Sequence, residues 1–284
     1  MATPAILLYA PDGTQFQRYA GSRGSGRRLG RTAAVAGDGP GFIGVGPDSL
    51  QRYPFGTQML LQDGRKYRFC VAGGTALVAR DLQQAAANEA NHVGLTAIAV
   101  GTDALRRAPT FTLGATAATA DQYAGGYLQV SVTPDIGSVY LIDDHAAVAS
   151  SGTMTALLAP GHRIRTDWTT ATRVNLLKHP YDGVIVYPTT STQVHVGVAV
   201  SALAAYATTG AGLAFGWLQT RGIASVRTNS TVVLGDGVYG AATTAGSVSA
   251  TTTTFAVAYT RIVGFVARVG ATTEDSAIFL TIDG

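Results

Sequence analysis

Two acidic residues and a histidine stand side by side at Asp143, Asp144 and His145. Carboxylate and imidazole groups can hold a metal ion or carry a proton. They follow Val139 and Leu141, which alternate with other residues as in a half-buried strand. Because consecutive strand residues point to opposite faces, the three side chains cannot converge on one ion without a bend. We therefore expect them to form the polar end of a strand.

Other residues that could do chemistry are scattered. His92, His162 and His179 have no partner at the spacing of a metal site, and the single cysteine, Cys70, excludes zinc sites with several thiolates. The chain has only two glutamates, Glu89 and Glu274. Few acids are therefore left to form the carboxylate pair of a glycosidase.

The stretch GSRGSG is the nearest approach to the G-x-S-x-G motif of serine hydrolases, but no strand leads into it and no helix follows it. It also lacks the lysine of a phosphate-binding loop. We expect no enzyme, no catalytic residue, no metal site and no cofactor.

Positive charge is concentrated near the N-terminus. Residues 1–31 carry five arginines against Asp12, while the rest of the chain is close to neutral. These arginines lie among glycine and serine, as in a flexible arm. The segment could bind a capsid or a neighbouring subunit, bind nucleic-acid phosphates, or be a solvated tail. It has no interleaved aromatic residues, so direct nucleic-acid binding is not expected. The interaction residues predicted here are Arg18, Arg23, Arg27, Arg28 and Arg31.

The composition predicts a mainly β protein. Charged residues make up only 13% of the chain, and glycine and β-branched residues are abundant. Short alternating segments separated by Gly, Pro, Asn or Asp favour β-sandwich or barrel-like domains. We predict an extended N-terminal arm at 1–56, a first β-rich region at 57–152 and a second at 153–284.

Four parts of the chain carry more specific predictions. Residues 75–91 favour a helix by propensity, although a strand followed by a loop remains open. Residues 215–226 predict two strands joined by a tight turn, with Trp217 in the core or in a subunit contact. His195 is expected to face away from the core that its neighbouring valines fill, as a surface or interface residue. In GYLQVSV, Leu128, Val130 and Val132 are expected to share one face of a half-buried strand.

No leader or membrane span is expected, because the first ten residues lack a basic and apolar signal pattern and no run approaches the ~20 apolar residues of a spanning helix. With one cysteine, no intrachain disulfide can form, which is typical of a protein made in a reducing cytosol.

The order of several segments resembles structural proteins of tailed-bacteriophage virions, in particular capsid decoration (cement) proteins. The resemblance runs from about Lys66 to Gly284 and does not cover the first fifty residues. It rests on these segments: KYRFCVAGG, ATAATADQYAGGYLQV, GSVYLIDDHAA, HPYDGVIV and GVAVSALAAYATTGAGLAFGWLQTRGIASV.

The resemblance implies a non-enzymatic, β-rich protein that is synthesised in the host cytoplasm and bound to the outer surface of the virion capsid. Its partners would be the major capsid protein and itself, as a homo-oligomer that is expected to be a trimer, holding neighbouring capsomers together. Such a role carries no catalytic residues.

Two alternatives remain at this stage. One is a tail or head-fibre attachment module that binds host glycans, with sugars stacked on tyrosines. The other is a lattice-forming major capsid protein, for which only residues 75–91 could supply a long helix. The tyrosines that would line a glycan site are Tyr123, Tyr127, Tyr181, Tyr187 and Tyr239.

Overall fold

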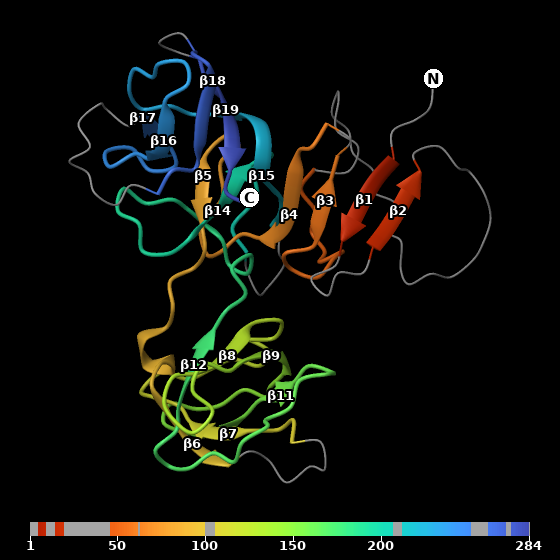
Figure 1. Cartoon of the computed structure of the whole chain (residues 1–284), viewed down its shortest axis with the longest axis vertical. Helices are drawn as coiled ribbons and strands as arrows, with labels where there is room; N and C mark the ends of the chain where they lie inside the picture. The colour runs from red at the N-terminus through yellow and green to blue at the C-terminus, as the bar shows by residue number, and fades with distance from the viewer. Residues whose placement is uncertain are drawn as a thin grey trace. The chain divides into compact units, whose positions relative to one another are not determined.

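The fold is almost entirely β, as the composition predicts. The computed structural model describes residues 46–61, 63–99, 106–206, 212–250, 261–270 and 274–283, together with the backbone of two strands nearer the N-terminus (Figure 1). Strands account for 40% of the chain and helix for 1%, and the antiparallel sheets are curled. The prediction of a mainly β, sandwich- or barrel-like fold is confirmed.

The chain forms two compact units, and one is inserted into the other. Unit 1 combines Met1–Ala86 with Pro180–Gly284, and unit 2 is Ala87–His179. The predicted boundary at 152/153 is therefore not where the units divide. The reason is strand pairing: the segment 173–177 pairs with segments at 95–96 and 127–130, so strands on both sides of residue 153 share one sheet.

The described strands of unit 1 form one sheet and pair antiparallel. Its main path runs β17-β16-β18-β19-β15-β4-β3-β1-β2, and β14, β5 and β13 continue from β15. The strands that the structure describes here are β1 (Ala5–Tyr9), β2 (Gln15–Tyr19), β3 (Gln58–Leu60), β4 (Lys66–Val71), β5 (Leu82–Gln84), β13 (Ile185–Val186), β14 (His195–Ala199), β15 (Phe215–Val226), β16 (Gly237–Gly240), β17 (Val248–Ala250), β18 (Gly264–Arg268) and β19 (Ser276–Thr281).

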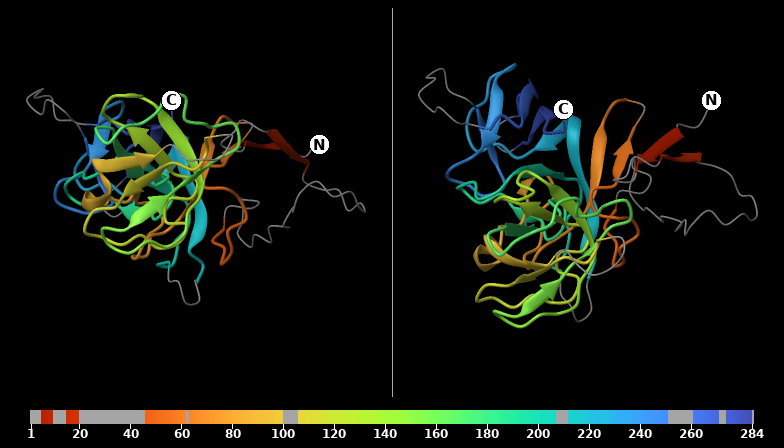
Figure 2. Two further views of the ribbon diagram at one scale, coloured as in Figure 1. Left: turned by 90° about the horizontal axis from the view of Figure 1, so that it is seen from below. Right: turned by 60° about the horizontal axis from the view of Figure 1, so that its bottom comes forward.

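β15 is one strand of 12 residues, not the two strands and tight turn predicted for this segment. Its first half pairs with β4 and β14, and its second half pairs with β19 (Figure 2). The change of partner is accommodated by a register shift between Gln219 and Arg221 and by Gly222, whose φ of +83° favours glycine. The glycine that suggested a turn therefore marks a bulge.

Aromatic rings fill the part of the core beneath the first half of β15. Trp217 is 3% exposed, which confirms its predicted place in the core. Phe69 of β4 meets the Trp217 ring edge-on at 5.3 Å and stacks on Phe215 at 6.2 Å. Tyr53 packs edge-on against Phe69 at 5.4 Å. Such pairs add to the stability that burial of the rings gives.

Part of the predicted N-terminal arm belongs to this sheet. β1 pairs with β2 and with β3, with Leu7 opposite Leu60 in the backbone register. Tyr53 and Phe55 pack against the aromatic cluster, and Asp48 forms a backbone bridge with Phe215. These segments of the predicted arm at 1–56 are thus part of unit 1, because β1 pairs along the edge of β3 and the aromatic rings need cover.

Unit 2 has its own sheet and its own core. The sheet order is β10-β7-β6-β12-β8-β9-β11, and a 3-10 turn, η1, precedes it. Leu128 and Val130 are buried on one face, as predicted, but Val132 is exposed because β8 ends at Val130. The elements are η1 (Ala90–His92), β6 (Leu95–Ala99), β7 (Thr110–Thr112), β8 (Tyr127–Val130), β9 (Val139–Asp144), β10 (Thr153–Thr155), β11 (Leu157–Leu158) and β12 (Arg173–Leu177).

The helix favoured for residues 75–91 does not form. The segment holds β5, loops on both sides of it and the start of η1, which is the alternative left open. Leu77 bridges to Leu203, and β5 pairs with β13 and β14. All three residues of β5 are buried, so tertiary packing overrides the helix propensity of this stretch.

Truncation of Ile142 tests the separate core of unit 2. Ile142 is 0% exposed, whereas Val139 on the same strand is 52% exposed. We expect Ile142→Ala to lower the free energy of unfolding of unit 2 by about 2–5 kcal/mol. The chain has two tryptophans, and only Trp168 lies in unit 2, so urea unfolding in a Trp217→Phe background reports on unit 2 through Trp168 fluorescence.

Val139→Ala is the matched control and should cost under about 1 kcal/mol, because it removes surface that is already wet. Equal losses from the two variants would contradict the assignment of Ile142 to the core.

Candidate functional site

Asp143 and Asp144 end β9, and His145 follows it, so the predicted strand end is confirmed. The two carboxyl groups are exposed while His145 is buried, and the three do not converge. Asp144 instead approaches Asp121, whose carboxyl hydrogen-bonds with it and raises its pKa. Across the described ranges, no group of three His, Cys, Asp or Glu side chains could hold a metal ion.

Two buried histidines of unit 2, His92 and His145, hold core segments together. His145 Nε2 accepts the backbone N–H of Tyr123 at 3.0 Å, and its Nδ1 lies 2.9 Å from the carbonyl of Ala146. His92 Nδ1 contacts the Tyr123 hydroxyl at 2.5 Å, and its Nε2 lies 3.0 Å from the Thr116 carbonyl. Both nitrogens of each ring are used within the core, which leaves none for a substrate or a metal.

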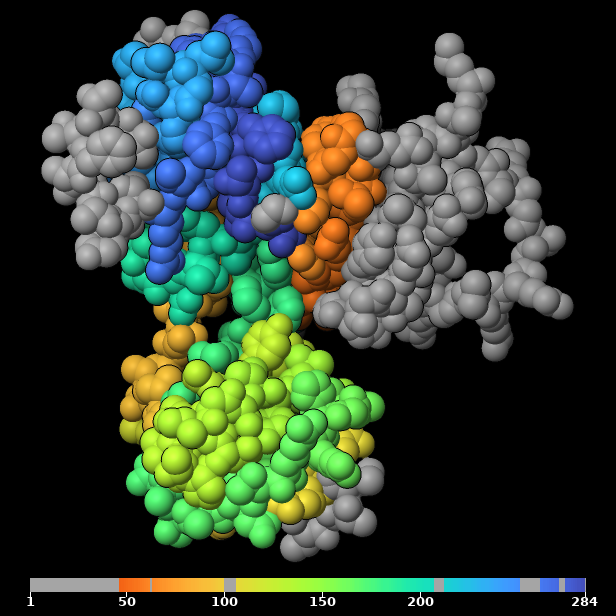
Figure 3. Space-filling view, in the orientation of Figure 1, coloured from red at the N-terminus to blue at the C-terminus, as the bar shows by residue number. Residues whose placement is uncertain are grey.

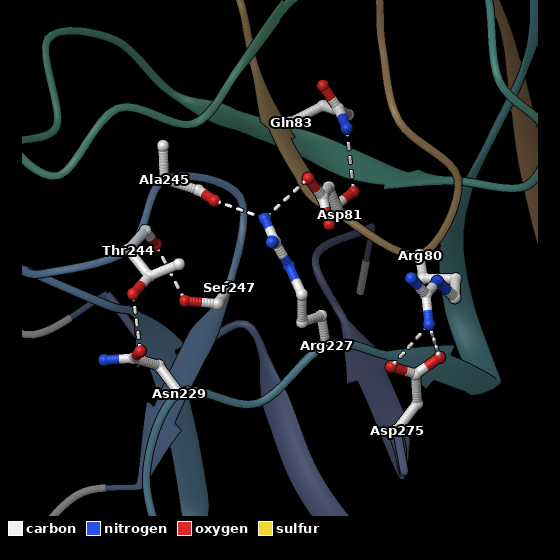
Figure 4. Close-up of polar contacts among 9 residues, drawn as sticks. All are labelled: Arg80, Asp81, Gln83, Arg227, Asn229, Thr244, Ala245, Ser247 and Asp275. Atoms are coloured by element: carbon white, nitrogen blue, oxygen red, sulfur yellow. Dashed lines mark hydrogen bonds and ion pairs between the residues drawn. The ribbon is translucent and has the colours of Figure 1, made fainter. Parts of the chain in front are cut away.

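In unit 1 a buried ion pair joins three segments that are distant in sequence. Asp81, 2% exposed, accepts a hydrogen bond of 2.8 Å from Arg227 Nη2, and the same nitrogen donates to the Ala245 carbonyl (Figure 4). Burial raises the pKa of Asp81, and the nearby guanidinium of Arg227 opposes this. Gln83 Nε2 donates to the Asp81 carbonyl at 2.9 Å.

This cluster, which we call the clasp, connects three segments of unit 1. Figure 4 shows Arg227 bonded to the Asp81 carboxylate, Gln83 bonded to the Asp81 backbone carbonyl, and Arg80 paired separately with Asp275. A Cβ on Gly246 would lie 2.4 Å from Asp81 Oδ2, so the backbone closes over the carboxylate.

His195 is half-buried and not on the open surface. The register of β14 shifts between His195 and Gly197, which breaks the simple alternation that the sequence suggested. The imidazole meets the Tyr187 ring edge-on at 5.0 Å. Burial, with a smaller contribution from Arg261, lowers the pKa of His195 to about 4.

The tyrosines proposed for glycan stacking do not form one platform. Tyr123 and Tyr187 are buried in the cores of different units. Tyr181 packs against a core cluster of unit 1. Tyr127 and Tyr239 are partly buried, also in different units. Rings inside a core cannot stack on a sugar.

Of the predicted interaction residues, Arg18 lies in β2, opposite Ile6 in the backbone register. Arg23, Arg27, Arg28 and Arg31 lie outside the described residues.

A row of exposed apolar side chains crosses unit 1 on the outer face of three neighbouring strands. Ile223 of β15 lies directly opposite Phe279 of β19, and Phe279 lies directly opposite Phe265 of β18. Their exposed fractions are 48%, 42% and 44%. The next residue in the row, Gly237 of β16, has no side chain to cover Phe265. We call Ile223, Phe265 and Phe279 the apolar row; β18 and β19 lie at the surface in the space-filling view (Figure 3).

Polar residues border the row on both sides. Arg221 and Thr281 lie opposite each other on one side, and Ser225, opposite the small Ala277, lies on the other. Arg268, beside Ala277, pairs with Glu274 at 2.8 Å. An apolar centre with a polar rim is the usual anatomy of a protein–protein contact.

Sequence reasoning missed this row, although a signal was present. In SAIFLT, Ile278 and Leu280 fill the inner face while Phe279 lies between them. A strand that is apolar on both faces is typical of one that is covered on both sides.

No family model matches the chain, and no curated protein sequence or solved structure is significantly similar to it. Within the part of the chain that the structure describes, no helix has the length and apolar character needed to cross a membrane.

The lowered pKa of His195 predicts a pH dependence of stability. Between its ordinary pKa of 6.5 and its folded value of about 4, the unfolded chain binds a proton that the folded chain does not. Stability is therefore lost as the pH falls through this window. We expect His195→Gln to remove a loss on the order of 2 kcal/mol, measured as the difference between urea unfolding at pH 7 and pH 4.5.

If the variant and the unaltered protein lose the same stability on acidification, the imidazole is not desolvated as described.

Substitution of Gly246 tests the clasp. Gly246→Ala places a methyl group against the Asp81 carboxylate at a residue whose φ is +76°. Gly235→Ala is the control, because Gly235 has a φ of +86° but open space around its Cβ position. Both variants bear the backbone strain, so the excess cost of Gly246→Ala, about 1–3 kcal/mol in urea unfolding, reports the steric contact alone. Equal costs would show that the carboxylate moves away freely.

Proposed function

We propose that the protein is a structural component of a tailed-bacteriophage virion, a decoration protein bound to the outer surface of the capsid. The apolar row of unit 1 carries the proposal, because contiguous exposed apolar side chains mark an interaction surface more often than single ones do. The resemblance of Lys66 to Gly284 to cement proteins supplies the partner, and the mainly β fold is compatible with it.

The size of the row limits what one copy can do. Three side chains that are each a little under half exposed leave on the order of 200 Å² of apolar surface. Burying it against a capsid contributes on the order of 5 kcal/mol before the costs of association. That is too little for stable attachment of a single copy.

Self-association would resolve this shortfall. In a homotrimer, three copies of the row reach the lattice together, and binding of the first raises the effective concentration of the others. The arginines of residues 1–31 add an electrostatic contribution where they meet a carboxylate-rich surface. Because such a protein binds only the assembled lattice, its occupancy stabilises the lattice by mass action.

Replacing the two phenylalanines tests the docking surface. Phe265→Thr with Phe279→Thr removes most of the apolar row. The replacement residue, threonine, is β-branched and therefore suits a strand. We expect at least a tenfold loss of affinity for purified heads that lack the protein, which corresponds to about 1.4 kcal/mol, measured by co-sedimentation.

The matched control is Val132→Thr with Ile136→Thr, which removes two exposed apolar side chains from unit 2. This control variant should bind heads as tightly as the unaltered protein. If both double variants bind as tightly as the unaltered protein, the row is not the docking surface. If the unaltered protein binds no heads, the proposed function is overturned.

Sedimentation equilibrium tests the trimer, and a mass of three chains of 29.2 kDa is expected.

A further inference from the structure

A cavity of about 250 Å³ opens in unit 2, the unit that does not carry the apolar row. Two short segments line it: the start of β9, with Ser138 and Tyr140, and the loop after β11, with His162, Arg163 and Arg165. The space is somewhat smaller than the roughly 300–1,000 Å³ of most small-molecule sites. It suits a ligand about the size of one sugar ring.

The loop that carries the arginines is fixed to the core. Ile164, between them, is fully buried, and its backbone N–H donates to the Arg106 carbonyl at 3.0 Å. Ala159 donates to the Leu141 carbonyl at 2.9 Å, which holds the loop against β9. The following tight turn uses Gly161, with a φ of +91°. Arg163 and Arg165 thus flank a core anchor and remain exposed at the cavity.

The polar floor of the cavity is also organised. Asp135 accepts hydrogen bonds from the Ser138 hydroxyl at 2.7 Å, the Tyr140 hydroxyl at 2.6 Å and Trp168 Nε1 at 3.2 Å. The Arg165 backbone N–H also hydrogen-bonds with the Tyr140 phenol oxygen. These contacts fix the two hydroxyl groups at the cavity wall, and the Ser138 oxygen has lone pairs left that can accept hydrogen bonds.

The charges in the cavity favour an anion. In the described ranges, no ion pair engages Arg163 or Arg165, since the acid nearest to the floor, Asp135, is occupied by neutral donors, and Asp167 pairs with Arg106. Two guanidinium groups at one opening suit a carboxylate or a phosphate, which they can bind through paired N–H donors.

We propose that this cavity is a binding site for a small molecule that carries one carboxylate or phosphate group beside hydroxyl groups. The oxyanion pairs with Arg163 and Arg165, and a ligand hydroxyl donates to the Ser138 oxygen. The proposal is independent of capsid binding, which depends on the apolar row of unit 1.

Titration of the full chain with three probes tests the site by NMR. Glucuronate supplies a carboxylate, glucose 6-phosphate a phosphate, and glucose neither. We expect one or both charged sugars to bind saturably and to shift the backbone amides of 138–141 and 161–165, whereas glucose does not. Which charged sugar binds more tightly identifies the oxyanion.

Charge removal supplies the matched comparison. Arg163→Gln with Arg165→Gln should weaken binding at least tenfold. Arg173→Gln with Lys178→Gln removes two positive charges from the same unit outside the cavity and should leave binding within about twofold, since distant exposed charges are screened by salt. The proposal is overturned if neither charged sugar binds, if glucose binds equally well, or if the two double variants behave alike.

Discussion

The architecture of unit 1 depends on the pairing of β15 along both of its halves. This strand of 12 residues pairs with β4, β14 and β19. Because sheets twist, a strand of this length must bend to keep its hydrogen bonds with all three partners. The bulge at Gln219 to Arg221 and the left-handed conformation of Gly222 turn the strand between these partners. Gly222 has a second constraint, because a Cβ there would lie 2.8 Å from Arg65 Cγ. Asp283, just beyond β19, pairs with Arg68 of β4 at 2.8 Å. This ion pair connects β4 and β19, the strands that pair with the first and second halves of β15.

The same pairing creates the apolar row. Once β15, β19 and β18 are in register, Ala224, Ile278 and Val266 face the core, and Ile223, Phe279 and Phe265 must face outward together. A slip of one residue in β19 would exchange its two faces, but both are apolar, so burial alone specifies this register weakly. The long ladder with β15 and the Asp283 ion pair supply what the pattern lacks. An outward face that is kept apolar at the expense of register specificity is most simply explained by a partner that covers it.

The sequence allowed the class of the fold to be predicted, because glycine-rich turns and β-branched alternation depend on local chemistry. It also allowed the burial of Trp217 and the strand end at Asp143 and Asp144 to be predicted, since these follow from neighbours within a few residues. The two units could not be divided from the sequence, because the partners of β12 lie about 45 and 80 residues earlier and nothing local marks them. The helix expected at 75–91 failed for the same reason: the burial of β5 is decided by β13 and β14, about a hundred residues later. The arginines of the cavity were likewise invisible, because only the fold of unit 2 brings 163–165 beside the start of β9.

The two proposed surfaces use different physical forces, and the charge distribution explains why they can coexist. The chain after residue 31 has nearly equal numbers of acidic and basic residues, so it exerts little long-range attraction on a partner. Contact through the apolar row therefore depends on burial, which salt does not screen. The cavity of unit 2 depends on two local guanidinium charges in a rigid loop, whose interaction with an anion weakens as salt rises. Because each unit has its own core, a ligand in the proposed cavity site and a partner on the apolar row would contact different residues, and substitutions can test the two proposals separately.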